Sequence, residues 1–189
     1  METPPDEGSG QFNLSYEIVS YFKDINDLKG LIFDWLTQNF DSMIESSEWK
    51  YRAAALALVY CITSGPNFDD QVSFLMPRFG AILGKCQDQS LAVIDTSLWI
   101  IEKIFRTYQP IVSNNEYFGQ IIHIVRNAQT APLILVIRVC DLVNCMGVCF
   151  RNSKDNPLYM EAFPTIASSM MTIIDRPDVP PSPALRHAY

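Results

Sequence analysis

The sequence has 189 residues, of which 48% are hydrophobic and 19% are charged, and its formal net charge at pH 7 is −7. This composition excludes a chain that is disordered throughout, because the apolar content is high enough to build a core. The acidic balance argues against nucleic-acid binding, which needs a basic surface, and favours a basic partner such as a Lys/Arg-rich peptide.

In chain order, helical patterns of apolar residues alternate with short breaks, and no strand-like alternation is evident. Helices are predicted at residues 14–23, 29–45, 48–64, 68–86, 90–108, 115–127, 131–150 and 157–174. The breaks have suitable chemistry: Ser46 and Ser47 offer an N-cap before one helix, and Gly65-Pro66 ends it. The chain is therefore predicted to be all-α.

The two ends of the chain differ from its middle. Residues 1–13 are rich in Pro, Gly, Ser and acids and are predicted to be a flexible lead-in. Residues 14–174 carry the helical patterns, and residues 175–189 form a Pro-rich tail that resembles the start of a truncated further helix. We therefore expect the chain to be a fragment of a longer repeat protein.

Apolar positions recur every 42 residues in the second helix of each predicted pair. The aligned columns are Leu56, Leu98 and Cys140, then Val59, Ile101 and Val143, then Ile62, Ile104 and Met146. Columns three residues apart lie on one helix face, which is therefore predicted to be buried. A two-helix repeat of about 40–47 residues is typical of HEAT and armadillo proteins. We predict an α-solenoid of three to four HEAT repeats in a right-handed superhelical stack.

The predicted first helices share a proline. Met76-Pro77 and Phe163-Pro164 occur at comparable points of their helices, about two repeats apart. Proline inside a helix is disfavoured by about 3 kcal/mol. Its recurrence at one phase predicts a bend in the first helix of the repeat.

Catalytic and metal-binding motifs are lacking. There are two histidines, His123 in an apolar helix and His187 in the tail, and no P-loop, nucleophile elbow, HExxH or Cys-x-x-Cys motif. The five cysteines follow neither disulfide nor zinc spacing and are predicted to be core residues of a protein in a reducing compartment. We expect no enzyme activity, no metal and no cofactor.

Residues 131–150 are the only stretch that suggests a membrane span. They include Arg138, Asp141 and Asn144, and a central charge costs roughly 2.5–3.5 kcal/mol on insertion scales. A buried helix with one polar stripe is the better interpretation, so no membrane insertion is expected.

Several segments resemble the importin-beta family of nuclear transport receptors. They are EWKYRAAA at residues 48–55 with the following Gly65-Pro66, DTSLW at 95–99 and DRPD at 175–178, while LMPRF at 75–79 resembles the general HEAT consensus. These segments occur in the family's order and spacing, over roughly residues 12–189. The resemblance implies a HEAT solenoid whose second helices line a concave surface. It also implies an import receptor that shuttles between cytoplasm and nucleus.

The resemblance implies protein partners as well. The concave surface would bind an importin-alpha-type basic helix or other cargo and release it when the GTPase Ran binds in its GTP form. Phe-Gly nucleoporins would be further partners, held between the first helices. Phenylalanines on those helices are mostly needed for the core, so none of them is assigned to this role.

Six residues are candidates for partner contact. Trp99 matches an inner-face tryptophan of the family, and its column with Ala57 and Asp141 is not uniformly apolar, which predicts exposure to solvent. Asp141 and Asn144, one helical turn apart, are suited to receive a basic side chain. The remaining candidates are Phe12, Asp6 and Glu7, which stand where the family has an acidic loop and a Trp-Asn pair.

Arg52 and Asp95 occupy second helices of successive repeats and are predicted to pair across the interface between repeats. The pair would be structural rather than catalytic. The alternative function for the whole chain is a HEAT scaffold or regulatory subunit unrelated to transport.

Overall fold

The structure, a computed structural model, describes residues 26–63, 68–108, 115–151 and 157–179, and within these ranges it contains helices and no strand. The elements are α2 (Asn26–Ile44), α3 (Trp49–Ile62), α4 (Phe68–Leu75), η1 (Met76–Arg78), α5 (Phe79–Gly84), η2 (Lys85–Gln87), α6 (Leu91–Thr107), α8 (Asn115–Asn127), η3 (Ala128–Thr130), α9 (Leu133–Arg151) and α10 (Pro157–Ile174). The predicted helix at 14–23 and the lead-in at 1–13 lie outside the described residues.

Most predicted helix limits agree with the structure, but the helix predicted at 68–86 is interrupted. The chain tightens into the 3₁₀ turn η1 at Met76–Arg78 and again into η2 at Lys85–Gln87. Pro77 accounts for the first interruption, because proline has no N–H to donate and collides with the preceding helical turn. The proline of α10, Pro164, lies inside an uninterrupted helix.

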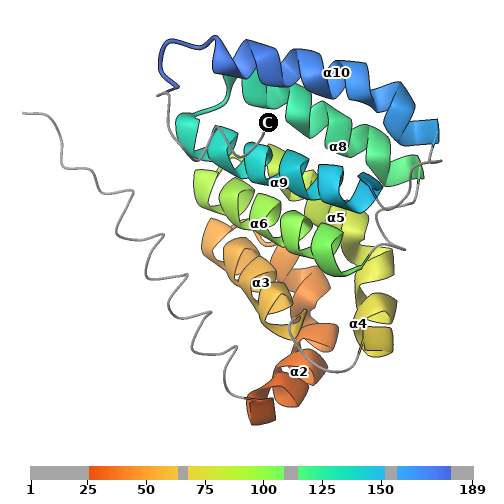
Figure 1. The fold of residues 1–189 in the computed structure, drawn as a ribbon. Coiled ribbons are helices and arrows are strands. Elements are labelled where there is room, and N and C mark those ends of the chain that lie inside the picture. The colour runs from red at the N-terminus through yellow and green to blue at the C-terminus, as the bar shows by residue number, and fades with distance from the viewer. Residues whose placement is uncertain (1–25, 64–67, 109–114, 152–156, 180–189) are drawn as a thin grey trace, which may run out of the picture.

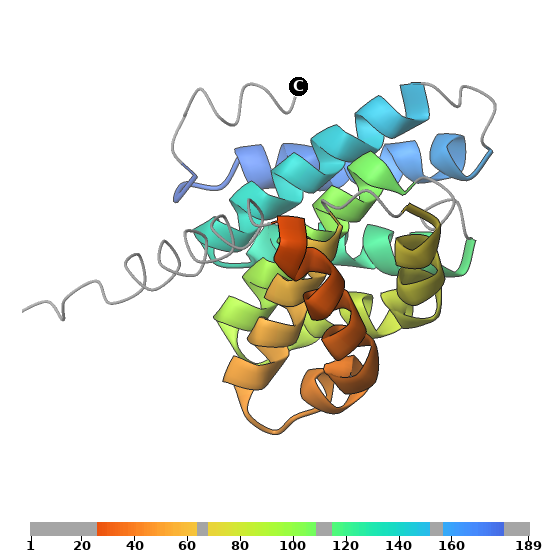
Figure 2. The same cartoon turned by 90° about the horizontal axis from the view of Figure 1, so that it is seen from below.

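The helices form two layers (Figures 1 and 2). One layer holds α3, α6 and α9 side by side in chain order, and the other holds α2, α4 with α5, α8 and α10. Helix α6 packs against α3 on one side and α9 on the other, whereas α8 contacts α5 and α10. Each helix pair therefore contacts its sequence neighbours, as in a solenoid.

The predicted 42-residue columns form the interior of the second-helix layer. Eight of the nine column residues are buried: Leu56, Leu98, Cys140, Val59, Ile101, Ile62, Ile104 and Met146. Val143 is partly buried and packs against the same core. The prediction of one continuous buried face is confirmed.

Aromatic side chains join the first helices of successive repeats. The rings of Phe33 and Phe40 on α2 meet Phe74 on α4 edge to face, with centroids 5.8 and 5.6 Å apart. Phe79 on α5 meets Tyr117 on α8 in the same way at 5.1 Å. Such geometry suits the charge distribution of aromatic rings. Phe40, Phe74 and Phe79 are buried, as a core role requires.

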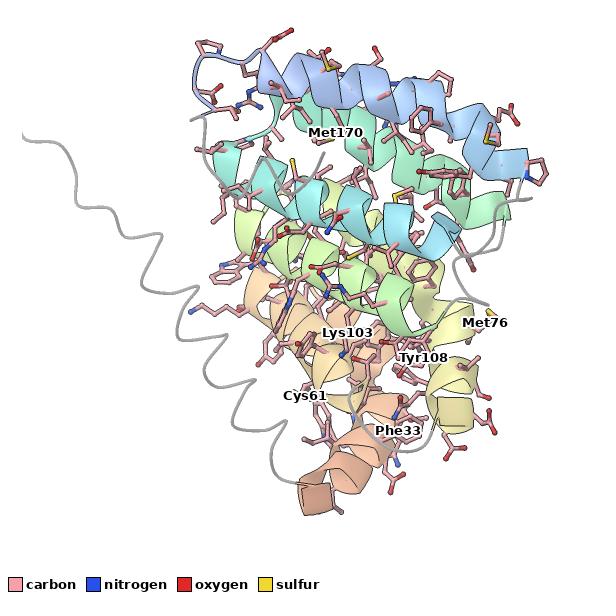
Figure 3. The ribbon with its side chains drawn as sticks, in the orientation of Figure 1. Phe33, Cys61, Met76, Lys103, Tyr108 and Met170 are labelled. Carbon is pink, nitrogen blue, oxygen red and sulfur yellow. The ribbon has the colours of Figure 1, made fainter. Side chains whose placement is uncertain are left out.

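Tyr108 joins three helical segments at the end of α6. Its side chain is fully buried, and its hydroxyl lies at hydrogen-bond distance from the Thr63 carbonyl oxygen (3.3 Å) and from the side-chain oxygen of Gln71 (Figure 3). Burial raises the pKa of Tyr108 to about 12, so this hydroxyl remains a donor at physiological pH.

Both ends of the described stack expose large apolar side chains. Leu31 and Trp35 on α2 are 66% and 48% exposed. On α10, at the opposite end in Figure 1, Met160, Phe163 and Met171 are more than half exposed. A solenoid whose terminal helices lack a covering neighbour presents such faces.

Replacing Phe79 by Ala should lower the free energy of unfolding by about 3–5 kcal/mol, because it empties a fully buried site and removes the ring contact with Tyr117. Urea unfolding followed by circular dichroism measures this change. The control, Met160→Ala on the exposed face of α10, should stay within about 0.5 kcal/mol of wild type. Similar losses in the two variants would contradict the assignment of the core.

Candidate protein-binding surface

The solvent side of α3, α6 and α9 forms one surface, here called the second-helix surface. Glu102 and Cys145 approach to 3.6 Å, and Asp95 and Arg138 to 2.8 Å, with 43 residues separating the members of each pair. Equal separations mean that α6 and α9 run parallel in a constant register. Side chains at equivalent positions of neighbouring repeats therefore lie in rows across this surface.

Trp99 is partly buried because it stacks on Tyr60 of the preceding repeat. The two ring centroids are 3.7 Å apart and the planes differ by 19°. Lys103 places its ammonium nitrogen 5.8 Å from the Tyr60 centroid (Figure 3). The Trp99 ring thus joins α3 to α6, and the residue as a whole is partly exposed.

Asp141 and Asn144 are exposed on α9, and for Asp141 the exposure agrees with the expectation from its column. Neither side chain makes a hydrogen bond or ion pair within the part of the chain that the structure describes, so both are open to a partner. The other candidates, Phe12, Asp6 and Glu7, lie outside the described residues.

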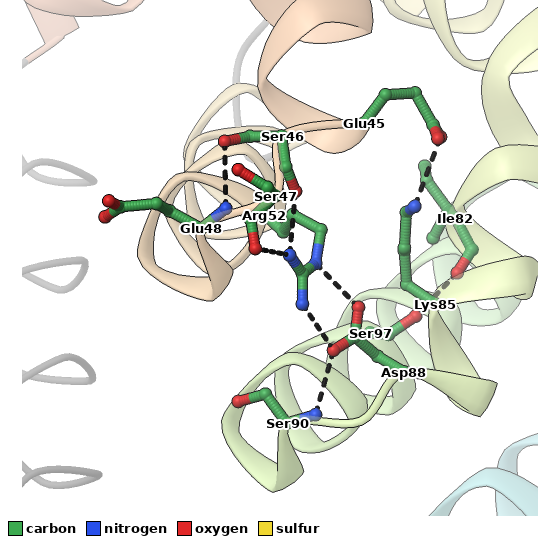
Figure 4. Close-up of polar contacts among 10 residues, drawn as sticks. All are labelled: Glu45, Ser46, Ser47, Glu48, Arg52, Ile82, Lys85, Asp88, Ser90 and Ser97. Carbon is green, nitrogen blue, oxygen red and sulfur yellow. Dashed lines mark hydrogen bonds and ion pairs between the residues drawn. The ribbon is translucent and has the colours of Figure 1, made fainter.

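The predicted pair of Arg52 and Asp95 is wrong, although both residues bind across repeat interfaces. Arg52 donates through Nε and Nη2 to the two carboxylate oxygens of Asp88, each at 2.7 Å (Figure 4). Asp95 instead accepts from Arg138 of the next repeat at 2.8 Å. Asp88 precedes α6 in the turn between the two helices of its repeat, a position that the helical alignment did not consider.

Arg52 also holds the turn that leads into α3. Its Nη1 donates to the carbonyl oxygens of Ser46 (2.7 Å) and Ser47 (2.9 Å), while Asp88 accepts from the Ser90 backbone N–H at 2.9 Å (Figure 4). The hydrogen bonds from Arg52 hold the pKa of Asp88 below its usual value. One guanidinium thus ties two successive interhelix turns together.

An arginine performs the same task two repeats further on. Arg176 donates to the carbonyl oxygens of Ala128, Gln129 and Ala131 (3.3, 3.3 and 2.7 Å) in the turn before α9, and pairs with Asp178. The DRPD segment after α10 therefore has a structural role. The resemblance to a family loop draws attention to this segment. The contacts of Arg176 with carbonyl oxygens could not be predicted, because such contacts follow no periodic pattern in a sequence.

Most acids of the second-helix surface are engaged within the chain. Asp95 binds Arg138, and Glu102 binds Arg106 at 2.7 Å while approaching Cys145. Asp141 is the acid on α6 and α9 that no described ion pair involves. On α3, α6 and α9 the acids Asp95, Glu102 and Asp141 are outnumbered by the bases Lys50, Arg52, Lys103, Arg106, Arg138 and Arg151, although the whole chain carries a charge of −7.

The described residues hold little reactive chemistry. Burial raises the pKa of Cys86 to about 12 and of Cys140 and Cys145 to about 11, so these thiols remain protonated at neutral pH. The described ranges bring no three His, Cys, Asp or Glu side chains into a metal-binding group. Within those ranges, no helix is long and apolar enough to cross a bilayer.

An open pocket of about 430 Å³ lies beside the Arg52 pair, at the start of α3 and α6. Its lining residues are Ser47, Glu48, Trp49, Lys50, Arg52, Gln89 and Ser90. Glu48 and Lys50, which form no ion pair among the described residues, line the pocket together with the paired Arg52, so the pocket has no strong preference for either charge.

The fold belongs to a known class, the HEAT-type α-solenoid, as comparison with solved structures indicates. One matching chain comes from a structure of Kap95p with RanGDP, described for its implications for nuclear import complex assembly. The TM-score is 0.74 at 12% sequence identity, over 99% of this chain and 25% of that one. This chain therefore spans about a quarter of the matched chain.

At 12% identity the likeness shows the fold, which confirms the predicted fold class. The chain has an importin-beta-like helical fold. No protein-family model matches the sequence. No curated protein matches it significantly.

Replacing Asp88 by Asn should make stability less dependent on acid. In wild type, the contribution of the Arg52 pair is complete above about pH 4, the usual pKa of Asp, and is lost as the pH falls through the lowered pKa of the folded state. The variant should therefore be less stable than wild type at pH 6, and the difference should shrink toward pH 2.

Urea unfolding at a series of pH values measures this difference. The matched control is Asp141→Asn, which removes a carboxylate without an ion pair. A deficit for Asp88→Asn that is the same at pH 6 and pH 2 would contradict the ion-pair assignment.

Proposed function

We propose that this chain is a segment of a nuclear import receptor of the importin-beta type, which holds a protein partner on its second-helix surface. The observation that carries the proposal is the importin-beta-like fold over 99% of the chain. The family-like segments in the family's order are a second, independent support, because they are a property of the sequence and not of the fold.

The partner proposed for this surface is a basic helix, such as that of an importin-alpha-type adaptor, or another basic cargo. Asp141 and Asn144 offer an exposed carboxylate and amide one turn apart, and the partly exposed Trp99 would add a cation–π contact. Phe12, Asp6 and Glu7 would extend the contact from the preceding segment. Because Asp95 and Glu102 are already paired, Asp141 and Trp99 would contribute most of the recognition in the described part.

The architecture of a solenoid is compatible with the proposed release by Ran in its GTP form. Each repeat contacts its neighbours through a few hydrogen bonds and ion pairs and through one apolar interface. Small rotations between neighbouring repeats therefore sum to a large change in the curvature of the stack. Ran-GTP would displace the basic helix by competing with it or by changing the curvature. Shuttling through nuclear pores, with Phe-Gly nucleoporins as further partners, belongs to the same proposal.

The test is binding of a basic importin-alpha-type helix, labelled for fluorescence anisotropy, to the chain with and without Ran-GTP. We expect salt-sensitive binding that Ran-GTP reduces and Ran-GDP does not. Trp99→Ala should weaken binding about tenfold, the effect of losing one partly desolvated cation–π contact. Asp141→Asn should weaken it about threefold, in the range of an exposed ion pair.

Tyr60→Ala is the matched control, because it removes the ring stack but leaves Trp99 in place. Equal weakening in Trp99→Ala and Tyr60→Ala would mean that Trp99 acts through the structure rather than by touching the partner. Absence of binding even when further repeats are supplied on both sides would favour the non-transport HEAT scaffold.

A further inference from the structure

Polar contacts are distributed unequally over the junctions between successive helix pairs (Figure 1). The first junction joins α2 and α3 to α4–α6, the second joins α4–α6 to α8 and α9, and the third joins α8 and α9 to α10. At the second junction the structure describes helices of both layers on both sides, so this junction lies inside the stack and not at an uncovered end.

Contacts in both layers hold the first junction. Arg52 binds both carboxylate oxygens of Asp88 at 2.7 Å, and the two side chains are only 13% and 7% exposed. In the first-helix layer, Arg78 binds Asp41 at 3.1 Å. The fully buried Tyr108 connects the end of α6 to the end of α3. Because a guanidinium binds a carboxylate in a fixed geometry, the Arg52 pair restricts rotation as well as separation.

The third junction is held at the turn between α8 and α9. Arg176, which follows α10, donates to the carbonyl oxygens of Ala128, Gln129 and Ala131 at 3.3, 3.3 and 2.7 Å. Gln129 also donates through Nε2 to the Ser169 hydroxyl of α10 at 3.0 Å. Helix α10 is therefore fixed to α8 and α9.

The second junction has polar contacts in its second-helix layer. Asp95 on α6 accepts from Arg138 on α9 at 2.8 Å, and Arg106 on α6 donates to the Cys145 sulfur on α9 at 3.0 Å. These contacts keep α6 and α9 together.

The first-helix layer of the second junction differs. Among the described residues, no hydrogen bond or ion pair joins α5 to α8, or the turn before α6 to the turn before α9. Lys85 and Asp88, which lie in the turn before α6, both bind partners in the preceding helix pair. Phe79 and Tyr117 contact each other by their rings, and such apolar contact is not directional.

We propose that the second junction is a hinge, at which α2–α6 rotate as one body relative to α8–α10. The axis would lie along the contact between α6 and α9, where Asp95 and Arg138 keep the two helices together. The rotation would open and close the first-helix layer between α5 and α8. Bending of this part of the solenoid would then be concentrated at one junction rather than shared equally by all three.

The hinge would also control the second-helix surface. Trp99 lies on α6 and Asp141 lies on α9, so the two candidate contact residues belong to different bodies. Rotation would change their spacing, and a partner that touches both would favour one hinge angle. This consequence rests on the proposed function, whereas the hinge itself does not.

Residual dipolar couplings of the backbone N–H groups, measured by NMR on the weakly aligned full chain, test the hinge without any partner. Hinge rotations occur within microseconds to milliseconds, and the couplings average over them. We expect one alignment tensor to fit α2, α3 and α6, a second tensor to fit α8, α9 and α10, and a common fit of all six helices to fail. A successful common fit would overturn the proposal, as would a division at the first or third junction instead.

Arg52→Gln should create a further division at the first junction, because it removes the contact that fixes α3 to the turn before α6. Helices α2 and α3 should then no longer share a tensor with α6. The matched control is Lys50→Gln, which removes an exposed base of the same helix that forms no ion pair among the described residues. Identical results for the two variants would overturn the assignment of the hinge from polar contacts. The wild-type comparison decides the proposal even if Arg52→Gln does not fold.

Adding the basic importin-alpha-type helix should reduce the difference between the two tensors, since its contacts with Trp99 and Asp141 would span the hinge. Unchanged tensors at saturation would overturn the control of the second-helix surface. Absence of binding would contradict the proposed function and would leave the wild-type test of the hinge unaffected.

Discussion

The arrangement of this chain depends on one constraint, which is that apolar faces of successive second helices meet in a constant register. A single helix pair of this length cannot bury its own apolar face, and stacking neighbours gives the face a continuous interior. The equivalent residues Leu56, Leu98 and Cys140, one on each of α3, α6 and α9, are all buried. Apolar contact alone permits sliding, and the arginines remove that freedom because a guanidinium binds several oxygen atoms in a fixed geometry.

The arginine contacts also explain why the candidate binding surface is less acidic than the composition suggests. Asp95 and Glu102 neutralise Arg138 and Arg106 within the stack. The exposed carboxylates Asp34, Asp41 and Glu45 instead lie on or next to α2, outside the layer of α3, α6 and α9. On the second-helix surface a partner would therefore meet more bases than acids, with Asp141 as the acid of α6 and α9 that no described ion pair involves.

The fold was predictable from the sequence because it depends on periodicity. The 42-residue columns and most helix limits follow from the spacing of apolar residues, and the limits of 115–127 and 157–174 are identical to those of α8 and α10. Pro77 predicts a bend, and the structure adds two 3₁₀ turns whose geometry depends on local hydrogen bonding. Exposure of Asp141 followed from its column, whereas the Tyr60–Trp99 stack did not, because side-chain contact between repeats depends on the helix offset.

Polar partners were the least predictable feature, since an arginine side chain reaches several residues beyond its own helical position. The most direct test is therefore a pair of double-mutant cycles for the free energy of unfolding at pH 7. The structure predicts a clear stabilising coupling between Arg52 and Asp88, and none between Arg52 and Asp95. Coupling of Arg52 to Asp95 with none to Asp88 would contradict the register in which these repeats are stacked.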